Sequence, residues 1–181
     1  MRRQRVLHRP QEVKEPFSSD EKSRLLAKAQ DLGMVNWVNV RRLCEVFLAI
    51  GPHTALFYQA SFYQPHIEKD CLVYTRPKNE KPIQFPIPRS MLPWLDEFLG
   101  SDFPSSRWWY QRLLVKLGAR CGFPTNFLRF RHTALSEALQ PPMSLTIPDA
   151  CIIFGVTPET CGIYGPRRPS EIARSMRERG W

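Results

Sequence analysis

Apolar side chains recur at helical spacing over the first fifty residues. The segment Phe17-Ser-Ser-Asp-Glu-Lys indicates a helix start, because Ser18 or Ser19 can accept hydrogen bonds from free backbone amides and the two acids suit the positive end of the helix dipole. This helix is predicted to continue to Gly33. A second helix is predicted over residues 37–50, where apolar positions fall on one side, and Gly51-Pro52 ends it.

The middle of the chain changes to an alternating pattern. Residues 53–63 are apolar and aromatic, and we expect them to be helical. Residues 71–75 and 83–87 then alternate as two short strands around a charged tip, which predicts a hairpin. Its second strand contains Pro86 and is followed by Pro88, so it should lie at the edge of a sheet.

Helical patterns return after the hairpin, and glycines or prolines mark their ends. The predicted helices cover residues 88–99, 105–121, 131–139 and 149–154. A basic stretch at 169–181 also has helical character. The predicted fold class is therefore mainly α with a small β-hairpin.

Charge adds a prediction about the partner. The 181 residues include 26 Lys and Arg against 17 Asp and Glu, for a net charge of +9. Such an excess favours a polyanion, most simply nucleic acid, although a solvated basic surface without a partner is the alternative. Residues 1–16 are charged and contain two prolines, which predicts a flexible basic arm.

Cysteine usage and hydropathy point to a cytoplasmic protein, associated with the nucleoid if bacterial. The five cysteines form no Cys-x-x-Cys pair, and free buried thiols explain them better than disulfides or zinc. No apolar segment follows the basic start, so a secretory signal is not expected, and the longest apolar runs are too short to span a bilayer. No metal or organic cofactor is indicated.

The segment with the clearest chemistry is Phe127-Leu-Arg-Phe-Arg-His-Thr-Ala-Leu, followed downstream by Tyr164 between two glycines. A tyrosine that cleaves a phosphodiester needs fixed cations around the phosphate, and Arg131 is suited to that role.

The order of these features resembles the catalytic domain of tyrosine recombinases, the phage-integrase and Xer-like family, over roughly residues 17–164. Ile50-Gly-Pro-His-Thr-Ala-Leu is similar to the family's Gly-x-Arg-x-Ser-Glu-Leu segment. Arg129-Phe-Arg-His-Thr is similar to Leu-Arg-His-Thr, and Phe154-Gly-Val to Leu-Gly-His. The hairpin resembles the one whose tip carries the catalytic lysine. The resemblance implies a catalytic-domain-like unit over residues 17–166 and a basic tail or helix over 167–181.

Carried over residue by residue, the resemblance is partial. It assigns Arg131 as the second catalytic arginine, Lys78 as the hairpin lysine and Tyr164 as the nucleophile that forms a 3′-phosphotyrosyl link to DNA. The first arginine is replaced by His53. The two histidines are replaced by Leu128 and Val156, which can neither donate nor accept a proton. Losing one preorganised charge donor typically costs on the order of 10²–10³ in rate, so this pattern predicts a degenerate active site. The family's chemistry needs no cofactor.

The predicted DNA contacts combine the resemblance with the basic segments. They are Arg131, Lys78, Lys81, Arg107, Arg112, Arg129, Arg167 and Arg168.

Structural alternatives stay open for these residues. Tyr164 is also explained as a loop aromatic, Arg131 with His132 as a helix-start pair, and the hairpin lysines as solvated side chains. Arg107 and Arg112 flank Trp-Trp-Tyr, which is typical of a core helix with snorkelling arginines.

Three functions are compatible with this reading. The first is a DNA-binding accessory or regulatory factor on a recombinase fold, associated with a mobile element. The second is an active site-specific recombinase that uses Tyr164. The third is a protein-interaction module whose charge only maintains solubility. Double-stranded DNA is the expected partner, together with a second copy or a second recombinase bound through the C-terminal tail, and no membrane is expected.

Overall fold

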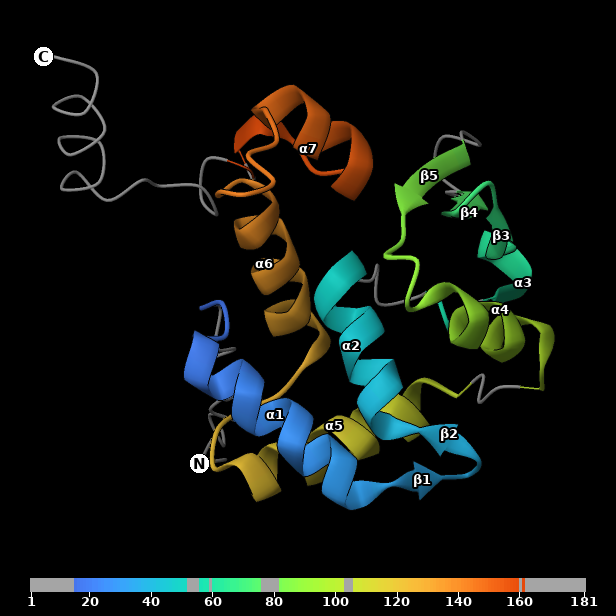
Figure 1. The fold of residues 1–181 in the computed structure, drawn as a ribbon, viewed down its shortest axis with the longest axis vertical. Helices are drawn as coiled ribbons and strands as arrows, with labels where there is room; N and C mark the ends of the chain where they lie inside the picture. Colours follow the sequence, from blue (N-terminus) through green and yellow to red (C-terminus); the bar gives the residue numbers. More distant parts are fainter. Residues whose placement is uncertain are drawn as a thin grey trace, which may run out of the picture.

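The computed structural model describes residues 15–51, 56–58, 60–75, 82–102, 106–159 and 161, and its described part is mainly helical (Figure 1). This confirms the predicted fold class. In chain order the elements are α1 Ser19–Leu32, β1 Met34–Val35, β2 Val38–Asn39, α2 Val40–Ile50, α3 Ala60–Tyr63, β3 His66–Glu68, β4 Cys71–Thr75, β5 Pro82–Pro86, α4 Leu92–Gly100, α5 Arg107–Cys121, α6 Phe127–Ala138 and α7 Ile147–Phe154.

Helix α1 begins where the sequence predicted. The Ser18 side chain accepts from the Glu21 amide at 3.2 Å, and the Glu21 carboxylate accepts from the Ser18 amide at 2.9 Å. This reciprocal capping box satisfies two amides that have no partner inside the helix. α1 packs against α2 and α5, and Figure 1 shows it in the lower part of the molecule, crossing in front of α5.

The second helix starts later than predicted. Residues 37–39 are not helical, because Val35 and Val38 pair in a small antiparallel hairpin. Asn36 and Trp37 form its turn with φ values of 46° and 60°, which a helix does not permit. The Asn39 side chain then accepts from the Arg42 amide at 3.0 Å and caps α2.

The sheet contains the predicted hairpin and one strand more. β4 and β5 pair antiparallel, with Leu72 opposite Phe85. The strand order is β3-β4-β5, so β5 lies at an edge of the sheet. Proline is tolerated there, because it has no amide to donate to a neighbouring strand. The helix predicted over residues 53–63 is confirmed only at its end: residues 56–58 form a turn, and α3 alone is helical among the described residues of that range. β3 was not predicted, since its three residues are too few to show a clear alternation.

The later helices also start at other residues than predicted. α4 begins at Leu92 rather than at residue 88, after a turn in which the Met91 amide bonds to the Pro88 carbonyl. α6 begins at Phe127 rather than at Arg131, because the Asn126 side chain accepts from the Arg129 amide at 2.8 Å. α7 begins at Ile147, two residues before the predicted start. The predicted end of α5 at Gly122 is confirmed.

An aromatic cluster fixes α2 against α6. The Phe47 ring of α2 lies 5.3 Å from the Phe127 ring and 5.4 Å from the Phe130 ring, both on α6, and 5.4 Å from Phe57. Burying each of these rings contributes about 1.5–3 kcal/mol, and aromatic pairs add somewhat more. This packing places the end of α2 beside the middle of α6, where the candidate site lies.

The cysteines are free thiols, as predicted. Cys44, Cys121 and Cys161 are buried, and Cys71 and Cys151 are half-buried. Burial raises the pKa of the Cys44 and Cys121 thiols, which keeps both protonated at neutral pH.

Candidate functional site

Three segments that are distant in sequence meet at Arg131. The first contact is between the end of α2 and α6. Gly51 has φ +51°, and a Cβ atom placed on it would lie 2.7 Å from the Ala134 Cβ and 3.1 Å from the Arg131 Cα. Glycine suits this position because a Cβ would collide with the Ala134 side chain, and because glycine adopts the positive φ without strain. The chain therefore passes Arg131 two residues before it reaches His53.

The second contact joins Arg131 to the end of α7. The Arg131 Nη2 donates to the Phe154 carbonyl oxygen at 3.1 Å. Carbonyl groups in the last turn of a helix lack partners within the helix and attract cations. The bond therefore fixes the half-buried guanidinium of Arg131 next to Gly155 and Val156, the residues that follow α7.

The neighbours of Arg131 are apolar where the family resemblance implies histidines. Leu128 lies three residues before Arg131 on α6, and Val156 lies two residues after the carbonyl that Arg131 binds. Both are half-buried. The site thus holds a positioned cation, but neither of these two side chains can transfer a proton to or from a leaving oxygen.

A hollow of about 350 Å³ lies beside Leu128 and extends onto α5. Arg107 and Gln111 of α5 line it, together with Asn126 at the start of α6. Arg107 is exposed. This hollow connects the predicted DNA contact at Arg107 with the α6 surface that carries Leu128.

Helix α5 presents a row of cations to solvent. Arg112, Lys116 and Arg120 follow one another at intervals of four residues and are all exposed, and α5 contains no acidic residue. Trp108, one turn before Arg112, is 70% exposed. In the part of the chain that the structure describes, none of these cations forms an ion pair within 4 Å with an acid. The outer face of α5 is therefore positive and carries an exposed aromatic ring.

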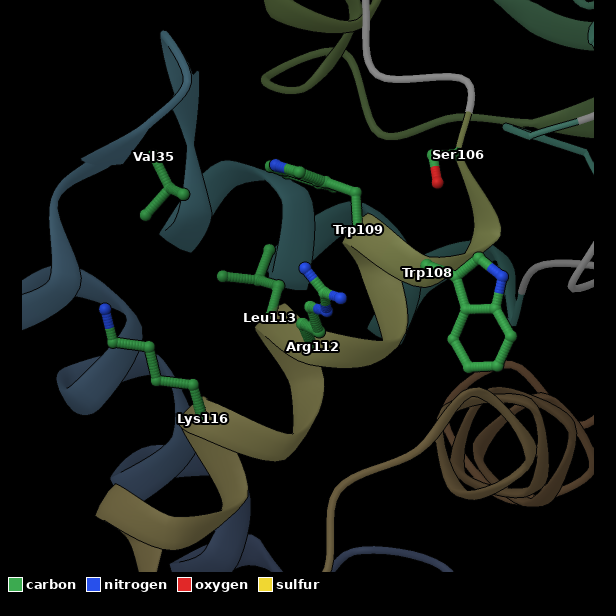
Figure 2. A pocket seen from close by; sticks show the side chains of 7 residues that line it. All are labelled: Val35, Ser106, Trp108, Trp109, Arg112, Leu113 and Lys116. Atoms are coloured by element: carbon green, nitrogen blue, oxygen red, sulfur yellow. The ribbon is translucent and has the colours of Figure 1, made fainter.

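Figure 2 shows a second hollow along this row, of about 780 Å³. Arg112 and Lys116 project from α5 at its rim, Trp109 and Leu113 form part of its wall, and Val35 of the β1–β2 hairpin lies across from them. Trp108 and Trp109 point in different directions although they are consecutive, so one ring packs inward and the other is left on the surface.

The position of Arg129 contradicts the prediction that this residue contacts DNA. Its side chain is only 5% exposed, and its Nη2 donates to both carboxylate oxygens of Glu21 at 2.7 Å. Its Nε donates to the Glu15 carbonyl and its Nη1 to the Pro124 carbonyl. The guanidinium also lies 4.3 Å from the centre of the Phe17 ring. Because these bonds hold Arg129 inside the fold, its position does not fit a contact with DNA.

The charge of Arg129 also affects its acidic partner. Burial raises the pKa of the Glu21 carboxyl, but the hydrogen bonds and charge of Arg129 and the bonds from Ser18 outweigh that effect. The net result is that the pKa of Glu21 lies below its ordinary value of 4.5.

The two residues after Arg131 are buried. His132 is buried, as expected for a packed histidine. The Thr133 hydroxyl donates to the Arg129 carbonyl at 2.8 Å and accepts from the Phe17 amide at 2.9 Å. Thr133 therefore fixes the segment before α1 against α6.

Several predicted site residues lie outside the described residues, so their roles stay predictions. They are His53, Lys78, Lys81, Tyr164, Arg167 and Arg168. Lys116 and Arg120 were missed by sequence reasoning, although their four-residue spacing from Arg112 was a visible signal.

Among the described residues, no group of three or more His, Cys, Asp or Glu side chains could hold a metal ion. Within the same residues no helix is long and apolar enough to cross a membrane.

Comparison with known proteins gives a match in structure only. No family model matches the sequence, and no curated protein matches it either. The structure is similar to that of XerA recombinase, with a TM-score of 0.68 and 16% identity, over 95% of this chain and 67% of that one. It is similar to the catalytic domain of bacteriophage HP1 integrase, with a TM-score of 0.64 and 20% identity, over 90% of this chain and 94% of that one.

A lambda integrase dimer bound to a COC′ core site is also similar, with a TM-score of 0.65 and 15% identity, over 88% of this chain and 62% of that one. At these identities the similarity establishes the fold alone. The chain has the tyrosine-recombinase catalytic-domain fold that its motif order predicted.

Proposed function

We propose that this chain is a DNA-binding protein that uses the tyrosine-recombinase fold with weak or no strand cleavage of its own. It acts as an accessory or regulatory factor in DNA recombination, associated with a mobile element. The similar lambda integrase structure is a complex with a DNA core site, which supports DNA as the ligand class.

The arrangement around Arg131 carries this proposal. Gly51, Arg131 and the Phe154 carbonyl lie together, so the guanidinium is held in place as a phosphate-binding cation requires. The apolar Leu128 and Val156 beside it remove the groups that would move protons. A site with this composition can hold a phosphate better than it can cleave one.

Helix α5 supports the same conclusion. Its exposed cations have no acid on their own helix, and Arg107 adjoins the hollow that Leu128 lines. A row of unneutralised cations along one helix suits the phosphates of duplex DNA, whose binding releases counterions. Arg107 and Arg112 therefore remain proposed DNA contacts, joined by Lys116 and Arg120.

A salt titration of binding to mixed-sequence duplex DNA tests the proposal. The affinity should fall as salt rises, and Arg131→Ala should weaken binding about 10- to 150-fold, because a hydrogen bond to a charged group contributes about 1.5–3 kcal/mol. The matched control is Arg42→Ala, which removes the same charge from an exposed residue in the first turn of α2, at the other end of that helix from Gly51. Affinity that is independent of salt, or equal for the two variants, would contradict the proposal.

The second candidate is an active recombinase with Tyr164 as nucleophile. One observation favours it: Arg131 is held at the junction of the same three segments that the family resemblance singled out. Trapping a covalent protein–DNA adduct on a nicked suicide substrate, lost in Tyr164→Phe, would support this candidate over the first.

Self-association or binding to a second recombinase through residues 169–181 belongs to the same proposal. Ile172, Met176 and Trp181 supply apolar anchors in that segment. An apolar hollow of about 560 Å³ among α2, β5, α6 and α7, lined in part by Met143 and Ile153, is a surface of the complementary kind. Sedimentation equilibrium of the full chain and of a 169–181 deletion tests self-association. A monomer in both cases would contradict it.

A further inference from the structure

Two thiols near the candidate site lie in contact. The Sγ atoms of Cys151 and Cys161 are 3.5 Å apart, and the two residues are ten positions apart in the sequence. Cys151 lies on α7, and the Cys161 amide donates to the Thr157 carbonyl at 3.0 Å in the short turn that follows. Neither residue belongs to the arrangement that holds Arg131.

The two thiols differ in access to solvent. Cys151 is half-buried, whereas Cys161 is buried. Burial, followed by the contact with Cys151, raises the pKa of the Cys161 thiol to about 11. A solvent-borne oxidant therefore reaches the Cys151 thiol first, and the buried Cys161 thiol then reacts with the modified Cys151.

The geometry permits a bond between them. A disulfide requires the sulfur atoms to approach to about 2.05 Å, which is a closure of about 1.5 Å from their present separation. Because Cys161 is a core residue, this closure comes from rotation of the two side chains and a small adjustment of the segment after α7. No other cysteine takes part in this disulfide.

We propose that Cys151 and Cys161 form a reversible modification site, at which a low-molecular-weight disulfide such as glutathione disulfide converts the two thiols into an intramolecular disulfide. The Cys151 thiolate attacks the small disulfide, forms a mixed disulfide and releases one small thiolate. Cys161 then loses its proton and attacks the Cys151 sulfur, which releases the second small thiolate. The protein loses two electrons and two protons, and the small disulfide gains them as two thiols.

The bond would connect two parts of the candidate site. α7 ends at Phe154, whose carbonyl accepts from Arg131, and Cys161 lies three residues before Tyr164. Oxidation would therefore tie the chain that leads to Tyr164 to the helix that positions Arg131. The thiol chemistry itself does not depend on DNA binding.

The tryptic map makes the site directly measurable. The sequence has no Lys or Arg between Arg131 and Arg167, so one peptide, residues 132–167, contains Cys151 and Cys161 and no other cysteine. Cys44, Cys71 and Cys121 fall in three other peptides. An intramolecular disulfide therefore appears as a single peptide that is two hydrogen atoms lighter than its dithiol form and that resists alkylation.

The experiment equilibrates the folded full chain with glutathione disulfide and glutathione at pH 8, quenches with acid, alkylates and maps the peptides. We expect the 132–167 peptide to become mainly the lighter, unalkylated form and to return to the dialkylated form after treatment with dithiothreitol. In the Cys161→Ser variant, the reaction should stop at a stable glutathione adduct on Cys151. Cys71→Ser, which removes the other half-buried thiol, should behave as wild type.

Circular dichroism of each variant verifies that it is folded, and the result for the wild-type chain does not depend on any variant. If the wild-type peptide carries glutathione, two alkyl groups, or a bond to Cys44, Cys71 or Cys121 in place of the internal disulfide, the proposal is wrong.

Discussion

Arg129 and Glu21 lie 108 positions apart in the sequence and form an ion pair, in which the Arg129 Nη2 lies 2.7 Å from both carboxylate oxygens of Glu21. The pair joins α6 to the first turn of α1. Glu21 also completes the capping box of α1, so one carboxylate both starts a helix and attaches it to the helix that carries Arg131. The position of Arg131 therefore depends on an arginine two residues away that faces the interior.

Replacing Arg129 should destabilise the fold. Arg129→Met leaves Glu21 without its cation and the Glu15 and Pro124 carbonyls without their donor, which we expect to lower the free energy of unfolding by about 2–4 kcal/mol. Arg42→Met is the matched control, since that arginine is exposed and pairs with Glu45, and its effect should be about 0–1 kcal/mol. Urea unfolding of both variants gives the comparison. Equal midpoints would mean that the pair contributes little.

The same pair predicts a pH dependence. Because the pKa of Glu21 is lower in the folded state than its ordinary 4.5, the unfolded chain binds more protons there as the pH falls through this range. The contribution of Glu21 is therefore fully present above about pH 4.5 and is lost as the pH falls through the folded-state pKa. Urea unfolding of wild type and Glu21→Gln from pH 7 to pH 3 should show the gap between them narrowing in acid. Parallel curves across that range would show that Glu21 does not contribute in this way.

Gly51 offers a test of the contact that brings the end of α2 to Arg131. Gly51→Ala places a Cβ 2.7 Å from Ala134 Cβ in a left-handed conformation, and should destabilise the protein by about 2–4 kcal/mol from strain and overpacking. Gly122→Ala is the control, because Gly122 is also a left-handed helix end, with φ +75°, and a Cβ there meets nothing within 4 Å. Its cost should be only about 1 kcal/mol, from the backbone conformation alone. Thermal unfolding of both proteins measures the difference, and equal losses would argue against a close contact at Gly51.

The parts of this fold that could be predicted from sequence are those with local causes. The start of α1 was predicted because Ser18 and Glu21 satisfy each other within one turn, and the edge position of β5 because proline lacks an amide donor. The start of α6 was missed, since the capping side chain of Asn126 precedes the motif that drew attention.

The errors at the site have non-local causes. Nothing near Arg129 in the sequence indicates that Glu21 will meet it, so its basic surroundings suggested a DNA contact instead. The junction of Gly51, Arg131 and Phe154 likewise joins three segments whose closeness follows from the packing of α2 and α7 against α6. The family resemblance suggested that junction, and residue spacing alone did not.

The cations of α5 should contribute to DNA affinity more than a matched pair elsewhere. Arg112→Gln with Lys116→Gln removes two charges from a helix that has no acid, and we expect the slope of log affinity against log salt to decrease in magnitude by about 1–2. Arg41→Gln with Arg42→Gln removes the same charge from two arginines that already pair with Glu45. That control should change the slope less. The same slope for both double variants would show that only net charge matters, and that α5 is not the contact surface.

Catalysis is the point at which the two candidate functions make opposite predictions. Each missing charge or proton donor typically costs on the order of 10²–10³ in rate, so wild type should form no covalent adduct on a nicked suicide substrate above the background seen with Tyr164→Phe. The reaction must be followed at a salt concentration where the DNA is bound, so that absence of adduct reports on chemistry rather than on affinity. An adduct that Tyr164→Phe abolishes would instead show that groups other than Leu128 and Val156 supply the proton transfer. In that case the chain would be a recombinase, because a phosphotyrosyl link is the intermediate that strand exchange requires.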